Sequence, residues 1–87
     1  MLAAVNRVYT HGGRQYHLQA EDLGPEQACF EARVYESGAV LWRKRVPYTD
    51  LLARKLPKMD EEEGVRTLMD KTLQTVQAAI AKGKLGG

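Results

Sequence analysis

The sequence contains few of the residue types on which disulfide-rich, metal-binding and membrane proteins depend. Cys29 is the only cysteine in 87 residues, so an intrachain disulfide and a cysteine-rich zinc site are both excluded. The apolar N-terminal stretch is interrupted at Asn6 and Arg7, which makes it too short for a secretory signal. No stretch approaches the ~20 apolar residues of a membrane span. These absences predict a cytoplasmic protein with no membrane partner.

A strong excess of charge of either sign is also lacking. Thirteen Lys and Arg residues against 11 Asp and Glu residues give a formal net charge of +2. That balance is too weak to indicate a nucleic-acid partner by itself, so any such hypothesis needs local clustering of cations. A hydrophobic content of 44% is ordinary for a globular protein. A chain of this length supports one hydrophobic core, and we predict a single domain over residues 1–87.

Alternating apolar and polar residues predict a β-meander over residues 5–47. Residues 14–20 and 29–35 alternate with period two, which is typical of half-buried strands. Glycines at 12, 13 and 38 can adopt the positive φ that tight hairpin turns require. In the fourth strand we expect Val40, Trp42, Lys44 and Val46 on one face, and Leu41, Arg43 and Arg45 on the other.

The last third of the sequence predicts a short helical connector over residues 49–59 and a long helix over 60–83. Asp60 is expected to be the N-cap, with Glu63 completing a capping box and Gly83 ending the helix. The helix has one broad apolar face, formed by Val65, Leu68, Met69, Leu73, Val76, Ala79 and Ile80. Residues 84–87 are expected to be a flexible tail.

Together these elements predict an α+β fold of ββββα order. The four-stranded antiparallel meander should be covered on one face by the C-terminal amphipathic helix. The opposite face of the sheet would then be open to solvent, and a partner could bind there.

Basic and aromatic residues are expected to alternate on this open face. The residues concerned are His17, Arg33, Tyr35, Arg43 and Arg45. Cations can follow phosphates while aromatic rings stack on bases, which is how single-stranded nucleic acids are bound. In strand and helix order only, the chain resembles the four-strand-plus-helix units of the Pur and Whirly single-stranded-DNA-binding families. The resemblance implies a nucleic-acid-binding role for the open face, although Glu31 can pair with Arg33 and leave only a solvated charged face.

Our main hypothesis is a non-enzymatic protein-interaction or regulatory module that acts as a homodimer. Tyr35 and Leu41 are large apolar groups among charges, and the fourth strand is expected to be a free sheet edge. We assign the protein contact to Tyr35, Leu41 and Arg43. An edge of this kind can pair with another strand. We expect no cofactor, no metal and no small-molecule substrate.

Three further features leave alternatives open. Cys29 and His17 could face each other on neighbouring strands as a nucleophile and base, but a strand cysteine is more often a core residue. The acidic loop Glu21–Gly24 could bind cations of a partner or form a simple turn. Gly86-Gly87 resembles the ends of ubiquitin-like and sulfur-carrier proteins, although the helix before it does not fit their topology.

Overall fold

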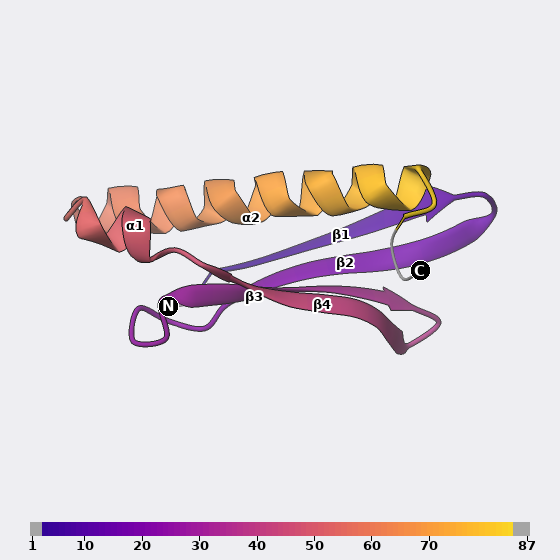
Figure 1. Ribbon diagram of the computed structural model, residues 1–87, viewed down its shortest axis with the longest axis horizontal. Coiled ribbons are helices and arrows are strands. Elements are labelled where there is room, and N and C mark those ends of the chain that lie inside the picture. Colours follow the sequence, from indigo (N-terminus) through magenta and orange to yellow (C-terminus); the bar gives the residue numbers. More distant parts are fainter. Residues whose placement is uncertain (1–2, 85–87) are drawn as a thin grey trace.

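A long helix lies across one face of a four-stranded antiparallel sheet (Figure 1). The computed structural model describes residues 3–84. The strands, in the spatial order of the sequence, are β1 (Ala4–His11), β2 (Arg14–Asp22), β3 (Cys29–Glu36) and β4 (Ala39–Pro47). Two helices follow, α1 (Thr49–Ala53) and α2 (Lys58–Ala81). The predicted ββββα fold is therefore confirmed.

Two-residue turns join β1 to β2 and β3 to β4. Gly12 and Gly13 have φ angles of 60° and 77°, and Ser37 and Gly38 have φ angles of 52° and 80°. Positive φ at both central residues is the pattern of type I′ turns, whose twist matches that of the flanking strands. These turns fix the register of both hairpins, and so decide which side chains share a face.

The core lies between the sheet and one side of α2. The largest fully buried side chains come from both layers, and they are Leu18, Phe30, Val34, Met69 and Leu73. On α2, the buried positions Val65, Met69, Leu73, Val76 and Ile80 recur every three or four residues. The predicted apolar face of the helix is confirmed. Arg7 of β1 also pairs with Asp70 of α2 at 2.7 Å, which ties the edge of the sheet to the helix.

The predicted start of the long helix was wrong. The helix begins at Lys58, directly after an N-cap at Pro57 that makes no side-chain capping bond, so Asp60 is not the cap and the connector is shorter than residues 49–59. Proline disfavours a helical conformation in the residue before it, so the helix does not extend to the N-terminal side of Pro57. The Pro57 carbonyl oxygen accepts the Glu61 N–H at 2.9 Å, which is the first hydrogen bond of the helix. Asp60 and Glu61 lie in the first turn, where their negative charges interact favourably with the helix dipole.

The end of α2 confirms Gly83 as the stop signal. Gly83 has a φ of 69°, its N–H donates to Ile80 O, and the Lys84 N–H donates to Ala79 O. These two bonds form a Schellman motif, which satisfies the last carbonyls of a helix. Lys84 therefore belongs to the helix end and not to a tail. The remaining predicted tail, including Gly86-Gly87, lies outside the described residues.

A β-bulge in β4 corrects the predicted faces of that strand. Val34 lies opposite Trp42, but the next residue, Tyr35, lies opposite Val40, so Leu41 is an extra residue without a partner in β3. Val40 was predicted on the helix side with Trp42. The bulge moves it to the open face beside Tyr35, because paired residues of neighbouring strands point to the same side.

Tyr48 fastens the junction between β4 and α1 to the end of β2. Its buried hydroxyl donates to Asp22 Oδ1 at 2.6 Å, and the same oxygen accepts the Gly24 N–H at 2.9 Å. Burial, and then the hydrogen bond to Asp22, raise the pKa of Tyr48 above its ordinary value of 10.0. Asp22, one of the two carboxylates in the segment Glu21–Gly24, thus has a structural role.

Helix α1 packs on the first half of α2 at Gly64. A Cβ atom added at Gly64 would lie 3.0 Å from both δ-carbons of Leu51. The absence of a side chain therefore lets α1 approach closely. The two helices border a hollow of about 450 Å³, which is lined by Asp50, Leu51, Arg54, Asp60, Glu63, Gly64, Thr67 and Leu68.

We expect Gly64→Ala to stabilise the protein more in a Leu51→Ala background than in the wild type. Alanine improves helix propensity by about 1 kcal/mol over glycine, and without the Leu51 methyl groups the new Cβ meets no obstacle. In the wild type, Leu51 must move, which offsets part of the gain. A double-mutant cycle of urea denaturation measures the difference. An equal gain in both backgrounds would show that Gly64 is not required for the approach of α1.

Candidate interaction surface

The open face of the sheet, opposite α2, carries three rows of side chains that run across the strands. Strand register places Val8, His17, Tyr35 and Val40 in one line, which we call the apolar row. The next line, the arginine row, contains Asn6, Gln19, Arg33 and Arg43. The third, the acidic row, contains Ala4, Glu21, Glu31 and Arg45. The rows are distinct in chemistry and lie side by side.

The structure places together the five residues that the sequence assigned to this face. His17 lies directly opposite Tyr35, Arg33 lies opposite Arg43, and Arg45 lies opposite Glu31. Their shared face is therefore as expected. What the sequence did not provide is their order, in which the aromatic and histidine rings occupy one row and the guanidinium groups occupy the other two.

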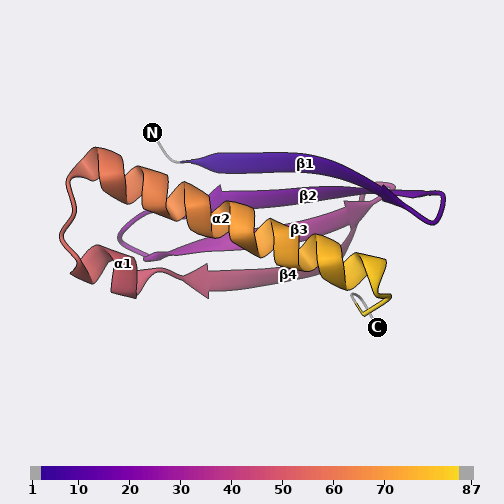
Figure 2. The same cartoon turned by 90° about the horizontal axis from the view of Figure 1, so that it is seen from above.

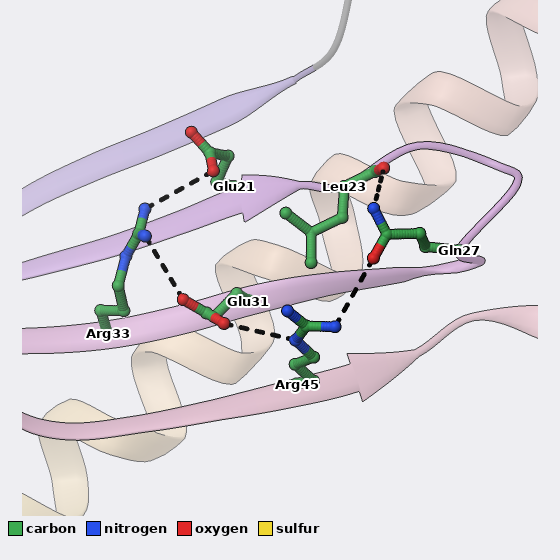
Figure 3. A network of polar contacts seen from close by, with 6 residues as sticks. All are labelled: Glu21, Leu23, Gln27, Glu31, Arg33 and Arg45. Carbon is green, nitrogen blue, oxygen red and sulfur yellow. Dashed lines mark hydrogen bonds and ion pairs between the residues drawn. The ribbon is translucent and has the colours of Figure 1, made fainter.

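Glutamates from the acidic row hold two of the arginines (Figure 3). Arg33 Nη1 lies 3.3 Å from Glu31 Oε1, and Arg33 Nη2 lies 3.8 Å from Glu21 Oε1. Arg45 Nε lies 3.4 Å from Glu31 Oε2. Gln27 extends this network into the loop before β3, because Arg45 Nη1 donates to its Oε1 at 3.5 Å.

This network removes most of the positive charge from the open face. Three arginines face two glutamates, so the formal excess is a single positive charge. Arg33 is half-buried between the two carboxylates, and its Nε atom is buried without a hydrogen-bond partner. Within residues 3–84, Arg43 makes no ion pair. It is therefore the most available cation among the three.

Two of the large hydrophobic side chains exposed to solvent in the described part of the chain belong to the apolar row, and a third directly follows it in sequence. Among residues 3–84, the large hydrophobic side chains exposed to solvent are Val8 (58%), Val40 (49%), Leu41 (41%) and Met59 (79%). Val8 and Val40 are the two ends of the apolar row, and Leu41 follows Val40 in the bulge. Only Met59 lies elsewhere, on the first turn of α2. The exposed apolar groups are thus concentrated on the open face.

A second, smaller hollow lies between β4 and α2. It measures about 280 Å³ and is lined by Trp42, Lys44, Val46, Thr72, Thr75 and Val76. Helix α2 crosses the sheet diagonally and does not cover β4 over its whole length (Figure 2), so Trp42 and Val46 stay only half-buried. Sequence reasoning missed this hollow, because periodicity gives the buried face of each element but not the angle at which they cross.

The hypothetical pairing of Cys29 with His17 was wrong. Cys29 is buried at the start of β3 opposite Pro47, whereas His17 lies opposite Tyr35 near the other end of the strand. The two residues are therefore separated along the sheet by the rows that contain Glu31 and Arg33. In the described part of the chain, no three His, Cys, Asp or Glu side chains lie close enough to hold a metal ion.

Comparison with known proteins finds no matching family model, curated protein or solved structure. No helix among residues 3–84 has the length and apolar character needed to cross a bilayer. The function proposed below therefore depends on the geometry of the open face.

Proposed function

We propose that this chain is a small, non-enzymatic protein-interaction module that acts as a homodimer and binds a protein partner on its open face. The observation that supports this most directly is the exposure of Val8 and Val40 in one row with the ring of Tyr35 between them, and of Leu41 in the bulge beside Val40. Apolar groups that lie together on a surface are more typical of binding sites than scattered ones.

The surroundings of the apolar row suit an interface core with a polar rim. Tyrosine and arginine are enriched at interfaces, and charged groups are depleted from their centres. Tyr35 lies inside the apolar row. Arg43 lies in the neighbouring arginine row, on β4. We therefore assign Tyr35 and Leu41 to apolar contact and Arg43 to a rim contact with an acidic group. The cytoplasm suits this role, because the single thiol of Cys29 is buried and free.

A Tyr35→Ala/Val40→Ser double variant should lose the partner while keeping the fold. Immobilised wild type, the double variant and a Met59→Ser control would be exposed to the same mixture of cytoplasmic proteins. Met59 is the matched control because it is equally apolar, more exposed and on a different surface. A protein retained by wild type and Met59→Ser, lost with the double variant and binding wild type again after purification is the expected result. Equal retention by all three baits would contradict an open-face site.

Single-stranded nucleic-acid binding is the second candidate. Arg43 and Arg45 are exposed on the same face as His17 and Tyr35, so a phosphate backbone and bases could both reach groups of the required kind. The pairing of Arg33 and Arg45 with glutamates weakens this candidate, because a nucleic acid must compete with Glu21 and Glu31 for these cations.

Fluorescence anisotropy of labelled single-stranded DNA and RNA separates the two candidates. At low and at physiological salt we expect no saturable binding in the micromolar range. Micromolar affinity that falls steeply with salt and disappears in an Arg43→Ala/Arg45→Ala variant would instead replace the protein-interaction proposal. The Tyr35→Ala/Val40→Ser variant serves as the comparison, since it keeps both cations.

A further inference from the structure

The two free edges of the sheet are protected to very different degrees. Edge strand β4 contains a bulge at Leu41, ends at Pro47 and carries the consecutive cations Arg43, Lys44 and Arg45. Bulges, prolines and lysines are three of the devices by which natural sheets prevent an edge strand from pairing with another chain. Edge strand β4 has all three.

Edge strand β1 has none of these devices. It contains no proline, and its register with β2 is unbroken from Ala4, opposite Glu21, to His11, opposite Arg14. Its single Lys or Arg side chain, Arg7, is already held by Asp70 of α2. Figure 2 shows β1 at the border of the sheet with no described segment beside it.

The backbone groups of β1 that are free to pair can be identified from its ladder with β2. The Asp22 N–H donates to Ala3 O at 2.9 Å, which makes Ala3 and Asp22 a hydrogen-bonded pair. Hydrogen-bonded and non-hydrogen-bonded pairs alternate along antiparallel strands. Every second residue from Ala3 onward, which in β1 means Val5, Arg7, Tyr9 and His11, therefore bonds to β2. The residues between them, Ala4, Asn6, Val8 and Thr10, direct their N–H and C=O groups away from the sheet.

We propose that the partner at this edge is a second copy of the chain, whose β1 pairs antiparallel with the first about a two-fold axis at Val8. The proposal rests on the homodimer part of the proposed function and adds to it the edge, the register and the residues in contact. The two four-stranded sheets become one continuous eight-stranded sheet, with both α2 helices on the same side.

The register follows from strand length and charge. Directly opposite residues of paired strands point to the same face. A two-fold axis perpendicular to the continuous sheet must therefore pass between two copies of the same residue, one from each β1. The two registers with the longest overlap of β1 are centred on Arg7 and on Val8. Centring on Arg7 would place two guanidinium groups directly opposite each other, which is unfavourable. Centring on Val8 avoids this contact.

The Val8-centred register is complementary at its central pairs. Val8 meets Val8 of the second copy, so a side chain that is 58% exposed becomes covered, and the two residues exchange both of their free backbone bonds. Asn6 meets Thr10, a pair in which the amide and the hydroxyl can exchange a hydrogen bond. On the helix side Arg7 meets the ring of Tyr9, a cation–π pairing. The apolar row then continues from one copy into the other.

Site-directed disulfides test the register directly. At a hydrogen-bonded pair the two Cα atoms lie about 5.5 Å apart, within the range of a disulfide, so Val8→Cys should form a covalent dimer under mild oxidation. Asn6→Cys and Thr10→Cys should each stay monomeric on a non-reducing gel, and should cross-link to each other when the two variants are mixed. Buried Cys29 is replaced by alanine in every variant, and Val40→Cys at the opposite edge is the control.

Sedimentation velocity supplies the second measurement. Wild type is expected at twice the 9.7 kDa of one chain, and Val8→Asp at the mass of one chain with an unchanged circular dichroism spectrum. A wild type that stays monomeric at all concentrations would overturn both this inference and the homodimer part of the proposed function. A dimer that cross-links through Val40→Cys but not through Val8→Cys would overturn the inference alone, and the homodimer would remain.

Discussion

Replacing Phe30 by alanine is expected to lower the free energy of unfolding by about 3–5 kcal/mol. The Phe30 side chain is the largest of those that are fully buried, and it lies between β3 and the helix. Its removal leaves a cavity that neither the sheet nor α2 can close without losing other contacts. The total stability of a domain with 87 residues is roughly 4–13 kcal/mol, so the change removes a large share of it.

Urea denaturation followed by circular dichroism measures this loss, with Val40→Ala as the matched control. Val40 also lies in the sheet, but its side chain points to solvent on the open face, so its truncation should change stability by less than about 0.5 kcal/mol. A similar loss in both variants would contradict a core centred between β3 and α2.

Tyr48→Phe is expected to lower the stability of the protein at neutral pH and to remove part of its loss of stability at alkaline pH. At neutral pH the variant loses the hydrogen bond to the Asp22 carboxylate, at a cost of about 1.5–3 kcal/mol. Because the pKa of Tyr48 is raised in the folded state, the stability it contributes is fully present below the ordinary pKa of 10.0. Above that pH the unfolded chain loses the phenolic proton first. Wild-type stability should then fall with rising pH, by at most about 1.4 kcal/mol per pH unit.

Denaturation curves between pH 7 and about 11.5 would reveal this signature, in which the stabilities of wild type and Tyr48→Phe converge as the pH rises. Tyr35→Phe is the control, since Tyr35 lies on the open face and should leave the alkaline decline unchanged. Parallel curves for wild type and Tyr48→Phe over the whole range would show that the hydroxyl of Tyr48 does not make the bond to Asp22.

The parts of the fold that could be predicted are those encoded in short-range patterns. Alternation of apolar residues located β2 and β3, the paired glycines located the first turn, and Gly83 located the end of α2. Each of these depends on a few neighbouring residues, whose conformational preferences are strong enough to be read without tertiary contacts.

The parts that could not be predicted depend on competition between signals or on pairing between strands. Asp60 and Glu63 have the spacing of a capping box, but Pro57 provided an earlier helix start. The bulge at Leu41 is set by its pairing with β3, and an alternating pattern contains no sign of it. In the candidate site, the Arg33–Glu31 contact was expected from neighbouring positions on one strand. The contacts of Arg33 with Glu21 and of Arg45 with Glu31 required the register between strands.

The order of the elements also affects how the chain emerges during synthesis. Each strand of the sheet pairs only with its neighbours in sequence, so the hairpins can form as soon as their strands leave the ribosome. Helix α2, which covers the apolar face of these strands, is synthesised after all of them. Until it arrives, Leu18, Phe30 and Val34 have no helix to pack against. A nascent chain that pauses before α2 would therefore expose an apolar sheet, and we expect that stage to be the one most in need of a chaperone.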